Sequence, residues 1–201
     1  MKEVLINNIL TNIKKNYKYD EIKLLEIKYG LETIYLTITK TVVIYLISFI
    51  LNMTLELSLL IIFYGILRLT GFGLHAKKSY QCWISSLIIF VCIPMAIKYL
   101  ILPKIIICIV SPLLCGLILK YAPADTEKRP LVNKQKRKTY KIITFIEYVI
   151  YSVVIILVNN NLIINTLFFS MILEVIVILP IIYRVFKLPY NNYLYYKKKG
   201  V

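Results

Sequence analysis

The sequence predicts an all-α, polytopic membrane protein with about six transmembrane helices and an N-terminal interfacial amphipathic helix. Of its 201 residues, 59% are hydrophobic, whereas a soluble domain is about 45–50% apolar. The hydrophobic residues come in long blocks, and blocks of roughly 17–25 apolar residues are typical of membrane-spanning helices. The basic residues, which give a net charge of +15, lie mostly between these blocks. We therefore expect a single membrane domain over residues 1–201.

The first expected element is an amphipathic helix over residues 1–18. Its apolar residues fall near one face and lysines occupy the remainder, which is the pattern of a helix lying in the headgroup region. The apolar residues are Val4, Leu5, Ile6, Ile9, Leu10 and Ile13. A charged stretch from Asp20 to Glu32 then leads into the membrane, so we assign residues 1–30 to an interfacial region.

Six apolar segments follow and predict a membrane core over residues 33–182. They are Thr33–Leu51, Leu57–Leu69, Trp83–Tyr99, Ile105–Leu119, Ile142–Val158 and Leu162–Ile182. The second and fourth are short for a full span, so we expect them to extend into their flanks, to tilt little or to meet locally thinned lipid. Residues 183–201 form a basic tail.

The distribution of positive charge predicts the orientation of these segments. The N-terminal region, the 68–82 and 120–141 loops and the C-terminal tail hold 22 of the 25 lysines and arginines. The opposite loops hold only Lys98 and Lys104. Because basic loops stay on the cytoplasmic side, we expect both termini to be cytoplasmic in a multi-pass protein of the bacterial cell membrane. This distribution favours contact with the lipid bilayer, and no binding of nucleic acid is expected.

The polar 68–82 loop contains the only histidine, His75, and Cys82 seven residues later. A thiol becomes a nucleophile as its thiolate, which a neighbouring base produces. Two residues seven apart in one helix are separated by about 10 Å, so such a pair requires a broken helix. Gly71 and Gly73 permit a break there, which predicts a cavity open to the cytoplasm. The alternative is a polar loop with a chance cysteine.

A second notable stretch, residues 121–130, is rich in proline and charge and is followed by a basic run. Such a run attracts anionic lipid or an acidic peptide. The alternative is an ordinary connecting loop. The candidate docking residues are Asp125, Lys128, Arg129, Lys134, Lys136 and Arg137.

Other polar residues lie inside apolar segments. Lys40 and Glu174 are charged residues of this kind, and charges there usually pair or face a cavity, so these two are candidate partners. Cys92, Cys108 and Cys115 are expected to be plain packing residues. No cysteine and histidine cluster has the spacing of a zinc site, so no metal and no cofactor are expected.

Two motifs together resemble the AgrB family. One is the histidine followed by alanine, with cysteine seven residues after the histidine and with Arg68 and glycines before it; the other is Ala-Pro-Ala-Asp-Thr-Glu-Lys-Arg-Pro-Leu at residues 122–131. Phe72 stands where many members of the family have glycine. The resemblance covers essentially the whole chain.

The resemblance implies a membrane cysteine endopeptidase of peptide quorum sensing. Such proteins remove the C-terminal tail of an AgrD-like propeptide through an acyl-enzyme thioester, and the peptide then closes into a thiolactone or lactone. By this resemblance Cys82 is the nucleophile, His75 the base, and Arg68 and Gly73 supporting residues. A homodimer is also expected. The rival interpretation, from another class, is a non-catalytic peptide transporter or export channel, with Lys40 and Glu174 marking its pathway.

Overall fold

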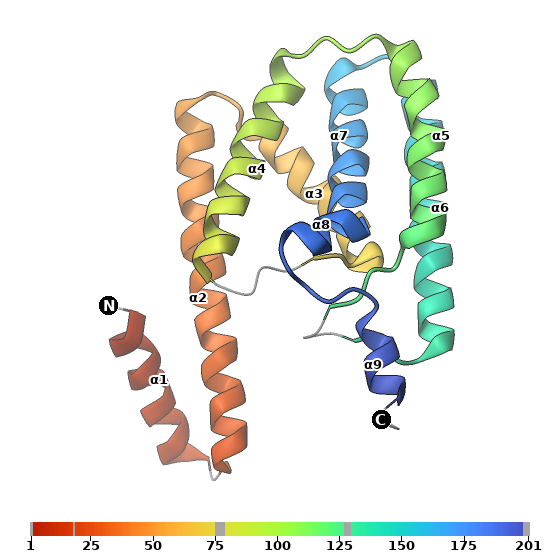
Figure 1. Cartoon of the computed structure of the whole chain (residues 1–201). Coiled ribbons are helices and arrows are strands. Elements are labelled where there is room, and N and C mark those ends of the chain that lie inside the picture. Colours follow the sequence, from red (N-terminus) through yellow and green to blue (C-terminus); the bar gives the residue numbers. More distant parts are fainter. Residues whose placement is uncertain (1, 18, 75–78, 127–129, 199–201) are drawn as a thin grey trace. The chain divides into compact units, whose positions relative to one another are not determined.

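The computed structural model describes residues 2–17, 19–74, 79–126 and 130–198, and these form an all-helical protein (Figure 1). No strand occurs among the described residues, where an isolated β-bridge joins Phe72 and Ala124. Within these described ranges, six helices are long and apolar enough to cross a membrane. The predicted fold class is therefore confirmed. The chain divides into two compact units, residues 1–50 and 51–201.

The first unit consists of helices α1 (Lys2–Asn16) and α2 (Glu21–Ile50), which pack against each other. Ile6 is buried in this unit. With 30 residues, α2 is about 45 Å long, longer than the roughly 30 Å hydrocarbon core of a bilayer. It begins well before the predicted span, because the charged stretch ahead of Thr33 is helical too. That α1 lies in the headgroup region stays a prediction.

The second unit contains the five other spanning helices and two short helices. Their bounds are α3 (Thr54–Gly71), α4 (Ser79–Tyr99), α5 (Lys104–Tyr121), α6 (Lys134–Leu157), α7 (Asn161–Ile178), α8 (Pro180–Val185) and α9 (Asn192–Lys198). The two short segments of the sequence prediction do extend into their flanks, since α3 and α5 reach 18 residues each.

Two further boundaries differ from the sequence prediction. Helix α6 begins at Lys134, well before Ile142, because the Asn133 side chain accepts the N–H groups of the first turn and the basic run that follows is helical. Helix α7 ends at Ile178 rather than continuing to Ile182. The residue before a proline avoids the helical region, so Pro180 ends α7 and begins α8.

Helix α7 is the centre of the second unit. It packs against α3, α4, α5, α6 and α8 and is the most deeply buried of the spanning helices, as expected for the most apolar of them. Its buried polar groups serve other helices as well as its own backbone. The Asn165 amide donates to the Ile97 and Leu100 carbonyls at the end of α4. Such bonds matter because lipid offers no substitute for an unpaired carbonyl.

Hydrogen bonds from other helices complete this packing. The Tyr148 hydroxyl on α6 donates to the Met171 carbonyl of α7 at 2.8 Å, and the Tyr151 hydroxyl donates to the Phe63 carbonyl of α3 at 3.0 Å. At the far end of α6, Lys104 donates to the Ile156 and Val158 carbonyls. The last turn of a helix attracts positive charge, which gives this lysine a local structural role.

Candidate active site

The site is built around the end of α3, where the helix stops at Gly71. Phe72 has φ +61° and Gly73 has φ +98°, so the chain turns sharply out of the helix. Positive φ costs little for glycine but is strained for a bulky residue such as phenylalanine. The predicted helix break at Gly71–Gly73 is therefore confirmed.

The chain that leaves α3 is held between two other segments. Gly73 donates its N–H to the Ala124 carbonyl at 2.8 Å, and Ala124 donates to the Gly71 carbonyl at 3.0 Å. Leu74 donates to the Val177 carbonyl at the end of α7, at 2.9 Å. The two motifs that the sequence singles out thus lie side by side, joined by backbone hydrogen bonds.

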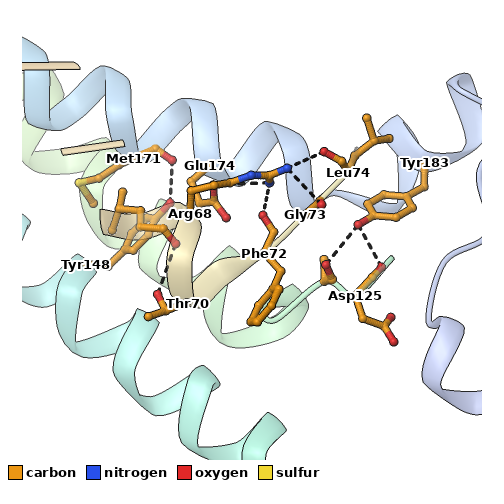
Figure 2. Close-up of polar contacts among 12 residues, drawn as sticks. Arg68, Thr70, Phe72, Gly73, Leu74, Asp125, Tyr148, Met171, Glu174 and Tyr183 are labelled. Carbon is orange, nitrogen blue, oxygen red and sulfur yellow. Dashed lines mark hydrogen bonds and ion pairs between the residues drawn. The ribbon is translucent and has the colours of Figure 1, made fainter. Parts of the chain in front are cut away.

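Arg68 gathers the carbonyls of this turn. Its guanidinium donates to the carbonyls of Phe72, Gly73 and Leu74, and Figure 2 shows the side chain running forward along the turn toward them. One planar guanidinium has five N–H donors, so it can hold several acceptors at once. Arg68 therefore fixes the backbone of the 72–74 turn, which includes Gly73. That these two residues support a catalytic site stays a prediction.

Glu174 lies beside Arg68 and belongs to α7, the central helix of the second unit. Its side chain has no exposed surface, and one carboxylate oxygen is 3.8 Å from the Arg68 Nη1. Among the described residues, neither carboxylate oxygen accepts a hydrogen bond. From the sequence, Lys40 is a candidate partner of Glu174, whereas in the structure Glu174 pairs with Arg68. A pairing across so many residues leaves no periodic signal in the sequence.

Asp125 is a buried structural group in this fold. Its carboxylate accepts the N–H groups of Asn192 at 3.0 Å, Tyr193 at 2.7 Å and Leu131 at 3.3 Å. Only 2% of the residue is exposed. A buried carboxylate that accepts three backbone N–H groups is not available at the surface to bind a substrate. The bonds of Asp125 therefore favour a structural role over the predicted docking role.

The C-terminal segment holds the same loop from another side. The Tyr183 hydroxyl donates to the carbonyls of Ala124 and Asp125, both at 3.3 Å. The Tyr190 hydroxyl donates to the Tyr121 carbonyl at 3.4 Å. Burial raises the pKa of both phenols above the ordinary value, which keeps them protonated as donors. No motif in the sequence predicts these hydrogen bonds between the C-terminal segment and the loop.

Cys82 lies in the first turn of α4 and is exposed. Cys92 is also exposed, further along the same helix, whereas Cys108 and Cys115 are partly buried. His75 lies outside the described residues, so its pairing with Cys82 stays a prediction. Lys128 and Arg129 lie outside them as well.

The remaining docking candidates lie on the first turn of α6. Lys134 and Lys136 are exposed, and they leave positive charge at the surface. The Arg137 guanidinium instead stacks on the Tyr193 ring, 3.1 Å from its centroid. This cation–π contact ties the start of α6 to the tail segment that Asp125 holds.

Comparisons with known proteins identify the family of the chain. The family model for AgrB, accessory gene regulator B, matches residues 6–178. A putative AgrB-like protein of Clostridium acetobutylicum is 30% identical over 196 residues, which cover 98% of this chain and 94% of that protein. A putative AgrB-like protein of Listeria monocytogenes serovar 1/2a is 32% identical over 200 residues, with the same coverage.

A third relative is the accessory gene regulator protein B of Staphylococcus aureus strain MRSA252. It is 29% identical over 148 residues, which cover 72% of this chain and 79% of that protein. No solved structure matches the chain. The family model spans well over half of the chain and includes all six spanning helices. The chain therefore belongs to the AgrB family, the accessory gene regulator B proteins.

Proposed function

We propose that this protein is a membrane cysteine endopeptidase of accessory gene regulator quorum sensing. Its substrate is an AgrD-like propeptide, from which it removes the C-terminal tail. The observation that carries the proposal is the placement of Cys82, an exposed thiol on the first turn of α4, which follows the 72–74 turn in the sequence. Membership of the AgrB family supports a role in autoinducer processing.

The reaction proceeds in two steps. The Cys82 sulfur attacks the scissile carbonyl, the C–N bond breaks, and the tail leaves with a new amino terminus that takes up the proton supplied by His75. The acyl-enzyme thioester then passes its acyl group to a thiol or hydroxyl of the peptide, which closes the ring and regenerates the Cys82 thiol. Exchange of one thioester for another is nearly isoenergetic, so the second step needs no external energy source.

The membrane supports this chemistry in two ways. Exclusion of water protects the thioester from hydrolysis. A substrate held at the same bilayer surface reaches a high local concentration. The site faces the cytoplasm together with both termini, and the exposed Lys134 and Lys136 attract an acidic peptide tail.

The test is cleavage of a tagged AgrD-like propeptide by the full-length protein in liposomes. Cys82→Ala is expected to abolish release of the tail, whereas Cys92→Ala, which removes another exposed thiol from the same helix, should retain it. An acyl-enzyme formed by the wild type should release its peptide with hydroxylamine. Normal release of the tail by the Cys82→Ala protein would refute the proposal.

A further inference from the structure

We propose that Glu174 is a positioning residue of this reaction, which acts through Arg68 on the backbone leading into the His75–Cys82 segment. The inference rests on the proposed function. It assigns a role to a buried carboxylate that the chemistry above does not use.

Arg68 is placed to fix the course of the chain after α3. Its guanidinium bonds three successive carbonyls, from Phe72 to Leu74, and His75 is the next residue. These bonds go to the backbone, so they set the path of the chain whatever the side chains are. An arginine stem has several rotatable bonds, and its planar head must therefore be held from a second side to keep one orientation.

Glu174 supplies that second side from another helix. Its carboxylate is 3.8 Å from the Arg68 Nη1, in a position without exposed surface. A buried charge is costly unless it is paired, and Arg68 provides the pairing among the described residues. The distance is longer than the roughly 2.7–2.9 Å of a charge-assisted hydrogen bond. The contact is therefore an electrostatic restraint on the guanidinium.

The other acids of this unit show why Glu174 is different. The Asp125 carboxylate is filled by backbone N–H groups, and the Glu147 carboxylate accepts the Thr70 hydroxyl at 2.6 Å. Both have the bonding of structural acids. Glu174 has no hydrogen bond of this kind among the described residues, so its interaction with its surroundings is concentrated on Arg68.

Gly71 shows that the fold makes room for this carboxylate. A Cβ atom at position 71 would lie 2.3 Å from Glu174 Oε1, closer than real Cβ atoms come, and 3.1 Å from its Cδ. The Glu174 carboxylate can therefore occupy its present position because residue 71 is glycine, and a larger residue there would force the carboxylate to move. The side chains at positions 71 and 174 would compete for the same space, so a larger residue at position 71 requires a shorter residue at position 174.

The first experiment measures steady-state cleavage of the propeptide by Glu174→Gln in liposomes. The carboxamide keeps the size and removes the charge, so we expect kcat to fall about tenfold to hundredfold, as for a misaligned catalytic group. KM should stay within about twofold, because the exposed docking lysines are unchanged. Ser170→Ala is the matched control, since its buried hydroxyl on α7 donates only to the Thr166 carbonyl of its own helix.

The second experiment tests the coupling of positions 71 and 174 and stays informative if Glu174→Gln folds poorly. Gly71→Ala alone should lower kcat by a similar factor, because its methyl group displaces the carboxylate. Glu174→Asp has a shorter side chain and should restore at least part of the activity in the double variant. If the fold loss of kcat in the double variant equals the product of the losses in Gly71→Ala and Glu174→Asp, the two positions are independent and the assignment is overturned.

A third measurement separates this inference from the proposed function, because it needs no substrate. The alkylation rate of Cys82 by iodoacetamide should fall severalfold in Glu174→Gln, while the rate of Cys92 stays constant. If the wild type fails to cleave the propeptide, the proposed function fails. If the wild type cleaves and Glu174→Gln keeps both the wild-type kcat and the Cys82 alkylation rate, the positioning role of Glu174 is refuted.

Discussion

Asp125 and Asn192 are bonded to each other twice. The Asp125 carboxylate accepts the Asn192 backbone N–H at 3.0 Å, and the Asp125 carbonyl accepts the Asn192 side-chain amide at 3.3 Å. The C-terminal segment is thereby joined to the 122–125 segment, which in turn bonds the turn after α3. A residue of the C-terminal segment thus supports the backbone next to the proposed catalytic segment.

Asp125→Ala should destabilise the protein. The substitution leaves the buried N–H groups of Asn192 and Tyr193 without an acceptor, which costs about 2–3 kcal/mol. Thermal unfolding of the purified protein in detergent measures the loss. The control is Asp20→Ala, because Asp20 accepts the Lys23 N–H at an exposed helix start, where the expected cost is about 1 kcal/mol. Equal losses in the two variants would contradict the structural role of Asp125.

The stability of the second unit should fall in alkaline solution. Burial raises the pKa of Tyr183 and Tyr190 in the folded state, while the unfolded phenols keep a pKa of about 10. The folded state then holds protons that the unfolded state has lost, so the stabilising contribution is complete below about pH 10 and decreases above it. Unfolding midpoints between pH 8 and 11 measure this slope.

Tyr183→Phe is the matching variant for the alkaline measurement. It removes one of the two phenols and its donations to Ala124 and Asp125, so it should be less stable at neutral pH. Its loss of stability above pH 10 should also be shallower than that of the wild type. An unchanged slope would show that Tyr183 titrates normally in the folded protein.

Gly73→Ala should abolish propeptide cleavage. A Cβ atom there would lie 2.2 Å from the Arg68 Nη1 and 3.0 Å from the Val177 carbonyl oxygen, at a φ of +98° that side chains rarely adopt. Cleavage in liposomes is the measurement. Gly65→Ala is the control, because nothing lies within 4 Å of its new methyl group. In α3 this control should preserve activity and stabilise the helix by up to about 1 kcal/mol.

The orientation of the spanning helices is tested with single cysteines in a cysteine-free background. Lys138 and Asn161 are exposed positions near the opposite ends of the α6–α7 hairpin. By the positive-inside rule, Lys138→Cys should react with an impermeant thiol reagent only after the cells are opened. Asn161→Cys should react in intact cells. The reverse pattern would place the basic loops outside the cytoplasm.

The spanning helices were predictable because long apolar blocks have few alternatives in a membrane protein. Their ends depend on single residues. The Asn133 cap starts α6 inside a lysine-rich run that has no apolar periodicity, so hydropathy places the start too late. The end of α7 was readable from Pro180, a local signal that the continuous apolar run obscures.

The candidate site was predictable only in its local parts. The glycines before His75 indicated the helix break, and a break of this kind depends on neighbouring residues alone. The contacts of Arg68 with Glu174, of Gly73 with Ala124 and of Asp125 with Asn192 join distant parts of the chain. Such contacts depend on how the helices pack, which is not encoded in the spacing of residues in any one segment.

The order of synthesis determines when the contacts that hold the turn at Leu74 can form. The acceptor of the Leu74 N–H and the counter-ion of Arg68 both come from α7, the last spanning helix to leave the ribosome. A nascent chain with five inserted helices already carries Cys82 but has neither of these contacts. Both contacts therefore form only after α7 has inserted, and a chain with five inserted helices lacks them around the turn that leads toward Cys82.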